Sequence, residues 1–253
     1  MSRSTKKSSE PSSKNTCSTN WSHYHQCQHY SLDYEFIEAI NGHLLSGEDI
    51  VQHTRKINYA TRPGEIGCAL SHIHIYRLIC ERGLKQALIL EDDAKLTPEA
   101  ISLLPQLALC DIPTKPLLTL LTASSQYLKK PIQALDKTHC LHRVVDAAMT
   151  HGYIINRTAA RNMAAGLYPV WMVADNFSIF QDYAFCQVRA VVPPVILHSI
   201  HAAQSHISIT PKPEAARNAI WQALKARAPW KVKCKHLLWG LLVRPFLSIV
   251  KQR

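Results

Sequence analysis

The stretch Gln86–Lys95 constrains the fold of this chain most, because an apolar run within it ends at three consecutive carboxylates, Glu91, Asp92 and Asp93. The run from Ala87 to Leu90 is short, continuous and bounded by glycine and proline, which predicts a fully buried strand of an α/β sheet. Open α/β sheets place their ligands at the carboxyl ends of strands. Adjacent carboxylates repel one another and are costly to bury unpaired, and a divalent cation removes both costs. Hard oxygen ligands suit Mn²⁺ or Mg²⁺, so the triplet indicates a metal site, and the alternative is a solvated acidic turn.

The distribution of charge narrows the class of partner. The chain has 253 residues, 47% of them hydrophobic and 19% charged, which is enough apolar material for a globular core. Of the net charge of +11, residues 1–20 carry +3 and residues 212–253 carry +9, which leaves −1 for the segment between them. Because the basic residues are confined to the two ends, we expect no nucleic-acid partner.

Cysteine usage and the N-terminal composition bear on localisation. The eight cysteines are scattered without a C-x-x-C pair, and those in apolar stretches (Cys68, Cys80, Cys110 and Cys186) are expected to be buried free thiols. Residues 1–20 are rich in Ser and Lys and lack the apolar region of a signal peptide. We therefore expect a cytoplasmic protein.

Helix and strand signals divide the chain into three parts. A helix is predicted from Pro63 to Cys80 with Gly83 as its stop, and a shorter one from Thr158 to Ala165 closed by Gly166. Further buried strands are expected at residues 116–122 and 152–155. The expected organisation is a disordered or degenerate N-terminal segment (1–31), a catalytic domain (32–211) and a C-terminal tail (212–253).

The tail has the composition of a basic amphipathic helical extension. Residues 215–228 can form a helix, and the apolar runs 237–243 and 246–250 are too short and interrupted to span a bilayer. Lysines beside Trp230 and Trp239 suit contact with an anionic membrane surface, which would make the protein peripheral at the inner face of the cytoplasmic membrane. The alternative is a helix docked on the parent domain with its basic face in water.

Four potential metal ligands, His23, His25, Cys27 and His29, occupy alternate positions near the N-terminus. On a strand they would share one face, which suits zinc. No second ligand cluster follows, so a compositional origin is the alternative.

Several motifs in order resemble glycosyltransferase family 25, the bacterial lipopolysaccharide and lipooligosaccharide galactosyltransferase-like enzymes. The motifs are Pro63–His72, followed after a helix by Ala87–Asp93, together with Tyr34–Gly42, His151–Asn156 and Val173–Phe177. The resemblance covers about residues 32–210. It implies a GT-A-like nucleotide-sugar-binding fold with a mixed sheet flanked by helices. It also implies transfer of a hexose, often galactose, from a UDP-sugar to a saccharide or lipopolysaccharide acceptor.

The resemblance also implies roles for individual residues. Asp93 would bind the Mn²⁺ (or Mg²⁺) that neutralises the leaving diphosphate, and Glu91 would support the metal or the ribose. Donor binding would involve Asp92 and the signature before the helix, namely Gly64, Glu65, Gly67, Ser71 and His72. The alternative for that signature is a simple helix start with a buried histidine.

Asp175 matches the late acidic residue of the family and would accept the proton of the acceptor hydroxyl as catalytic base. Its alternative is an N-cap or turn aspartate. A metal-dependent phosphoryl or nucleotidyl transferase would also use clustered acids, but it predicts a phosphate-binding glycine-rich loop with a lysine, which is not found.

The family pattern opens with an apolar strand and an Arg-rich loop, and residues 1–31 contain no such strand. This departure favours a second functional hypothesis, an inactive membrane-attached glycosyltransferase remnant that acts as a binding protein.

Overall fold

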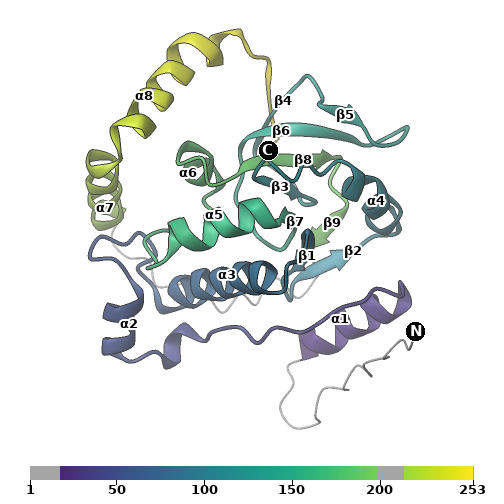
Figure 1. Ribbon diagram of the computed structural model, residues 1–253, viewed down its shortest axis with the longest axis horizontal. Coiled ribbons are helices and arrows are strands. Elements are labelled where there is room, and N and C mark those ends of the chain that lie inside the picture. Colours follow the sequence, from purple (N-terminus) through teal and green to yellow (C-terminus); the bar gives the residue numbers. More distant parts are fainter. Residues whose placement is uncertain (1–17, 199–213, 253) are drawn as a thin grey trace. The chain divides into compact units, whose positions relative to one another are not determined.

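The computed structural model describes residues 18–198 and 214–252, which form two compact units, one up to Glu35 and one from Phe36 onward. In the first unit, α1 spans Ser18–His29. The remaining elements belong to the second unit (Figure 1). Its helices are η1 (Gly42–Leu44), α2 (Gly47–His53), α3 (Pro63–Glu81), α4 (Pro98–Leu109), α5 (Arg157–Leu167), α6 (Phe177–Asp182), α7 (Glu214–Arg227), α8 (Trp230–Leu238), η3 (Trp239–Val243) and η4 (Arg244–Phe246). Its strands are β1 (Gln86–Leu90), β2 (Ala94–Leu96), β3 (Leu117–Leu120), β4 (Gln126–Leu128), β5 (Gln133–Ala134), β6 (Cys140–Asp146), β7 (Gly152–Asn156), β8 (Gln187–Val192), β9 (Ile196–His198) and β10 (Ile249–Lys251).

The second unit is a mixed α/β fold with a central sheet flanked by helices, as the sequence predicts. The sheet has the order β1-β7-β3-β8-β6-β4-β10, and β5 pairs with β6. All of these pairs are antiparallel except β3 and β8. Because β1 and β3 both run antiparallel to β7, their carboxyl ends lie at the same edge of the sheet. The sheet therefore brings the end of β1 and the end of β3 together at the start of β7.

Helices α3 and α5 pack side by side and close one core (Figure 1). On α3 the fully buried apolar side chains recur at helical spacing, at Ile66, Ile73, Tyr76 and Ile79. They form one cluster with residues of β3 and β7, including Leu118 and Ile155. This cluster fixes the face of α3 that turns toward the sheet.

The predicted helices and strands are confirmed, with two corrections. Gly83, with φ of +65°, follows α3 as expected, but Gly166 lies inside α5, which continues to Leu167. A Cβ at Gly166 would lie 2.4 Å from the Phe185 ring, so this glycine permits close packing and does not end the helix. The first strand, Gln86–Leu90, is not fully buried, because β1 pairs only with β7 in the described chain and is half-buried at most positions.

The N-terminal predictions concern residues that the structure describes only in part. Of the segment 1–31, expected to be disordered or degenerate, residues 1–17 lie outside the described residues, and the helix α1 occupies Ser18–His29. The alternating His and Cys positions 23–29 lie in α1, where residues two apart point to nearly opposite sides, so the shared face expected for a strand does not form.

The C-terminal tail contributes directly to the second unit. Helices form where the sequence predicts them, and β10 pairs with β4 at one edge of the sheet. On α7, Trp221 and Leu224 pack against the core, and Arg217 forms an ion pair with Glu65 at 2.9 Å. The expected boundary at residue 211 falls in the segment 199–213, outside the described residues. None of the helices in the described ranges is long and apolar enough to cross a membrane.

The described cysteines are all free. Of the four that we expected to be buried, Cys186 is buried, while Cys68, Cys80 and Cys110 are half-buried.

Candidate functional site

Three carboxylates, Glu91, Asp92 and Asp93, form a tight turn between β1 and β2, and we call this turn the acidic edge. The Ala94 N–H donates to the Glu91 carbonyl at 3.1 Å and closes the turn. The Glu91 N–H donates to the His151 carbonyl, which extends the pairing of β1 with β7 by one residue. The acidic edge is therefore held by the sheet itself and lies at the carboxyl end of β1, as the sequence predicts.

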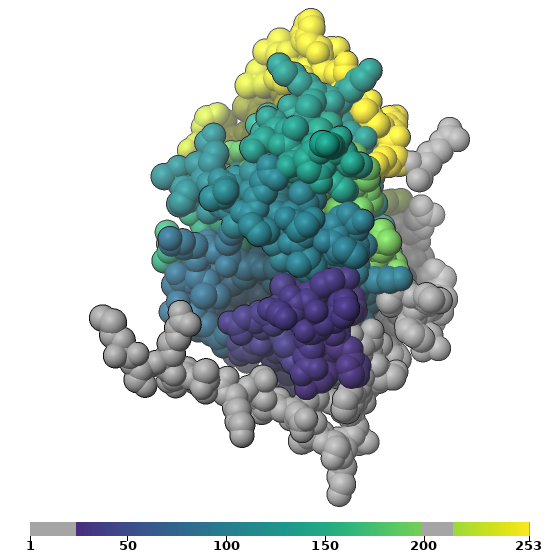
Figure 2. Space-filling view, turned by 90° about the vertical axis from the view of Figure 1, so that its right-hand side faces the viewer, coloured from purple at the N-terminus to yellow at the C-terminus, as the bar shows by residue number. Residues whose placement is uncertain are grey.

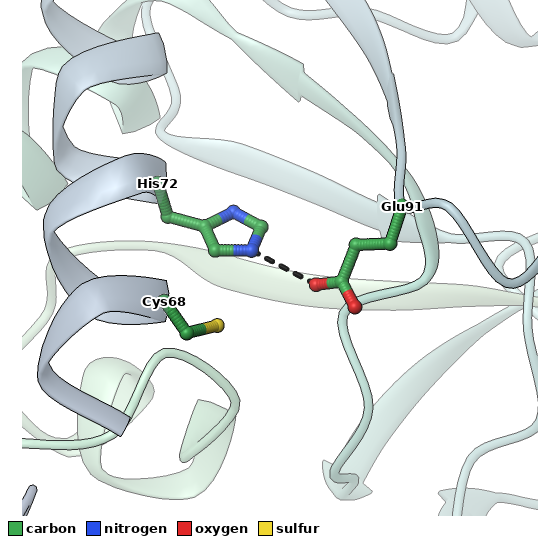
Figure 3. Close-up of side chains that lie close together, drawn as sticks. All are labelled: Cys68, His72 and Glu91. Carbon is green, nitrogen blue, oxygen red and sulfur yellow. Dashed lines mark hydrogen bonds and ion pairs between the residues drawn. The ribbon is translucent and has the colours of Figure 1, made fainter. Parts of the chain in front are cut away.

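The side chain of Glu91 is paired with His72, which reaches it from the middle of α3 (Figure 3). His72 Nε2 lies 2.9 Å from Glu91 Oε1, and His72 Nδ1 lies 2.7 Å from the Tyr153 hydroxyl. The Tyr153 hydroxyl lies 3.0 Å from that of Tyr76. This chain of hydrogen bonds runs from the core to the acidic edge and fixes the orientation of Glu91.

The charges of this pair are set by its surroundings. Burial alone would lower the pKa of His72, but hydrogen bonds to Cys68 and Glu91 outweigh it and raise the pKa to about 10. Burial raises the pKa of Glu91, and the hydrogen bond and charge of His72 then bring it below its usual value. At neutral pH the arrangement is thus an imidazolium–carboxylate pair, with both ring N–H groups donating.

Within the described ranges, one group of three side chains could hold a metal ion, namely Cys68, His72 and Glu91 (Figure 3). Their ligand atoms lie within 4.8 Å of one another. However, both ring nitrogens of His72 are already engaged, and a protonated imidazole cannot bind a metal. The mixed sulfur, nitrogen and oxygen set also differs from the all-oxygen sets that Mn²⁺ and Mg²⁺ prefer.

Asp93 fits a hard cation better. Its Oδ1 is buried without a hydrogen-bond partner, and Oδ2 lies 3.4 Å from Nδ1 of His198. Burial, followed by the charge of Glu91, raises the pKa of Asp93. This carboxylate oxygen could bind a cation, but the described structure does not bring the ligand atoms of Glu91, Asp92 and Asp93 together within 4.8 Å of one another.

His198, which lies against Asp93, packs against a second histidine, His151. The rings of His151 and His198 lie 3.8 Å apart, and burial, followed by the proximity of His198, lowers the pKa of His151 to about 4. His151 is therefore neutral at pH 7, and its Nδ1 is buried without a hydrogen-bond partner. At the end of β3, Thr122 and Ser124 also bury hydroxyl oxygens without partners. Unsatisfied polar atoms are rare in protein interiors, so their concentration at this edge indicates a ligand site.

Asp175 lies in the loop before α6, and its Oδ2 accepts the Met149 N–H at 3.4 Å. Met149 has φ of 82°, and its sulfur lies 3.0 Å from Nε2 of His198. This residue therefore links Asp175 to the histidine that contacts Asp93. The neighbouring Trp171 is buried, and its indole N–H donates to the Gly166 carbonyl.

His72 pairs with Glu91 of the acidic edge, whereas the contacts of Glu65, Gly67 and Ser71 lie at the start of α3 and in the segment before it. Glu65 lies about 10 Å along the helix axis from His72. Its Oε2 accepts the N–H groups of Thr61 and Arg62, and its Oε1 pairs with Arg217, which is the geometry of a helix-capping residue. Gly64 lies in the first turn of α3, and its predicted contact with a donor stays a prediction.

Gly67 and Ser71 hold the segment that precedes α3. A Cβ at Gly67 would lie 2.4 Å from the Ile40 carbonyl oxygen and 2.6 Å from the Gly42 nitrogen. Ser71 Oγ accepts the Ile40 N–H and donates to the Gly67 carbonyl, both at 2.8 Å. These contacts assign both residues a packing role, and their predicted contact with a donor stays a prediction.

The sequence alone assigns no role to Tyr153, His151 or His198. Tyr153 and His151 lie in the motif His151–Asn156, so their position in the resemblance was a usable signal. His198 carried no comparable signal, because the pairing of β9 with β2 that brings it to Asp93 is visible only in the fold.

The described residues thus form a mixed sheet with a carboxylate-rich edge and several buried polar atoms that have no hydrogen-bond partner. The sequence model described as glycosyltransferase family 25 (LPS biosynthesis protein) matches residues 22–178, more than half of the chain. The chain belongs to this family, as the motifs predict. The matched range includes the acidic edge, His72, His151 and Asp175.

Two curated relatives are similar to parts of the chain. One, named procollagen galactosyltransferase 1-B, from Xenopus laevis, is 33% identical over 25% of this chain and 12% of its own length. Another, procollagen galactosyltransferase 1 from Danio rerio, is 26% identical over 53% of this chain and 22% of its own length. The matches thus cover less than a quarter of either relative.

Proposed function

We propose that this glycosyltransferase moves a hexose, in particular galactose, from a UDP-sugar to a saccharide acceptor at the acidic edge. The observation that carries the proposal is the placement of Glu91, Asp92 and Asp93 at the end of β1, with an unpartnered oxygen on Asp93, inside the range matched by the family. The names of the two relatives support galactose as the sugar.

Asp93 and Glu91 would hold the Mn²⁺ or Mg²⁺ ion of this reaction. When bound, such an ion offsets the negative charge that develops on the leaving diphosphate. The role of His72 follows from its hydrogen bonds, since the imidazolium holds Glu91 ionised and fixes its orientation. His72 is therefore proposed as a positioning residue.

Asp175 is proposed as the base. In the transfer, the bond between the anomeric carbon and the diphosphate oxygen breaks, and a bond from the acceptor hydroxyl oxygen to that carbon forms. The hydroxyl proton then passes to the Asp175 carboxylate, and UDP leaves with the electron pair of the broken bond. Support for this assignment is indirect: Asp175 contacts Met149, whose side chain contacts His198, the histidine that pairs with Asp93.

A lipopolysaccharide or lipooligosaccharide acceptor and a peripheral position on the inner face of the cytoplasmic membrane remain part of the proposal. The family description supports this acceptor class. The basic tail supports contact with an anionic membrane surface.

The proposal is tested by measuring UDP release and sugar transfer with UDP-galactose and UDP-glucose, each with Mn²⁺ and an oligosaccharide acceptor. We expect UDP-galactose to be preferred. Asp175→Asn should abolish transfer while UDP binding persists, and Glu99→Gln, which changes an exposed acid on α4, should behave as wild type. Tight UDP binding without release from any UDP-hexose would contradict the enzyme proposal and favour the alternative of a binding protein.

A further inference from the structure

A cavity of about 650 Å³ lies at the opposite end of the strands from the acidic edge. Its lining includes Leu117 and Gln187, the first residues of the parallel strands β3 and β8, whereas the acidic edge lies at the carboxyl end of β1. Five lining residues are basic and none is acidic. The basic residues are Lys115, Lys129, Lys130, Arg143 and Arg189.

Two of these cations face each other across the sheet. Arg143 on β6 and Arg189 on β8 are direct register partners in an antiparallel pair, so their side chains lie on the same face. Like charges directly opposite each other are destabilising in a sheet. A bound anion would remove that repulsion, and it is the ligand that this cavity favours.

One basic side chain, Arg189, is held by hydrogen bonds within the protein, whereas others are exposed and able to contact a ligand. The Arg189 guanidinium is half-buried and donates to Thr119 Oγ1 and the Cys110 carbonyl, which fixes its position in the wall of the cavity. Lys129, Lys130 and Arg143 are exposed, and no carboxylate in the described residues forms an ion pair with them. Their charges are therefore available to a ligand.

The rim of the cavity is apolar and is formed by the C-terminal tail. Phe246 and Leu247 line the cavity, and the Phe246 side chain is 82% exposed. The Lys129 N–H donates to the Ser248 carbonyl at 2.8 Å, which ties the tail to the basic wall. In Figure 2 the yellow C-terminal residues adjoin the teal residues of the sheet at one end of this face. Further exposed apolar side chains, Leu241 and Leu242, precede Phe246.

We propose that this cavity binds the phosphate headgroup of an anionic phospholipid, with Phe246 entering the membrane interface. A basic cavity with an exposed aromatic rim matches a ligand whose anionic head adjoins an apolar body. A free phosphate compound would use the same cations but would leave the exposed Phe246 without a role. The proposal builds on the proposed membrane contact of the tail and specifies which part of the protein meets the membrane. It does not depend on the transfer chemistry, so a failure to release UDP would leave it untouched.

The test is sedimentation of the full chain with two kinds of vesicle, phosphatidylcholine alone and phosphatidylcholine with phosphatidylglycerol. We expect binding only to the vesicles that contain phosphatidylglycerol. The double variant Lys130→Gln/Arg143→Gln should bind them about thirtyfold more weakly, since each basic residue near the surface contributes about fivefold. The matched control Lys56→Gln/Lys137→Gln removes two exposed charges outside the cavity and should bind as wild type. Thermal melts of each variant establish that it is folded.

Two further measurements separate a lipid from a soluble anion. Phe246→Ser should weaken vesicle binding severalfold, and inorganic phosphate should displace the chain no better than sodium chloride of equal ionic strength. Equal losses in the cavity variant and its matched control would overturn the proposal, because binding would then follow net charge alone. Displacement by millimolar phosphate, with Phe246→Ser unchanged, would also overturn it by identifying a site for a soluble phosphate compound.

Discussion

Gly67→Ala separates a packing role from a donor-binding role at the start of α3. The added methyl group would lie 2.4 Å from the Ile40 carbonyl oxygen and 2.6 Å from the Gly42 nitrogen, and both are backbone atoms that cannot rotate away. Overpacking of this kind costs about 3 kcal/mol at the upper end of its usual range. Alanine is about 1 kcal/mol better than glycine inside a helix, so the net loss should be about 2 kcal/mol.

Thermal unfolding followed by circular dichroism measures this loss. We expect the melting temperature to fall by about 4–8 °C, since about 2–4 °C corresponds to each kcal/mol in a chain of this size. The matched control is Gly47→Ala on α2, where a Cβ meets nothing within 4 Å, and it should be neutral or slightly stabilising. An unchanged stability for Gly67→Ala, together with weaker UDP binding, would refute the packing role and restore the donor-binding interpretation.

Three further predictions concern the interactions around α3. Because the pKa of His72 is raised in the folded state from 6.5 to about 10, its stabilising contribution is complete below pH 6.5 and is lost as the pH rises through about 10. The melting temperature of wild type should thus fall more over that interval than that of His72→Gln, and parallel curves would contradict the assignment. Tyr153→Phe should cost about 1–3 kcal/mol in urea denaturation, because it leaves a buried hydrogen bond of His72 unmade, and a neutral effect would argue against that bond. Arg217→Ala should lower the urea midpoint by leaving Glu65 without its partner, whereas the exposed Arg227→Ala should not, and equal effects would show that the ion pair contributes nothing.

Local signals predicted much of the fold. The helix from Pro63, with Gly83 after it, follows from hydrophobic periodicity and from the residues that begin and end helices. The strands near residues 117 and 152 follow from their short apolar runs, and the carboxylate triplet lies at the end of another such run. Gly166 shows the limit of such signals, because only the packing of Phe185 against it reveals why it is a glycine.

The site was less accessible to sequence reasoning because it is assembled by pairing between distant strands. His198 reaches Asp93 through the pairing of β9 with β2, and Arg143 faces Arg189 through the register of β6 and β8. Neither contact leaves a local pattern in the sequence. The signature at the start of α3 likewise does not distinguish the capping role of Glu65 from a role in donor binding.

The most direct test of the central claim is calorimetric titration of UDP into the full chain with and without Mn²⁺. The account predicts that UDP binding by wild type is strengthened by Mn²⁺. It predicts that Asp93→Asn loses that strengthening but keeps its fold, and that Glu81→Gln, an exposed acid at the end of α3, behaves as wild type. Mn²⁺-dependent UDP binding that persists at full strength in folded Asp93→Asn would contradict the claim that the acidic edge holds the metal.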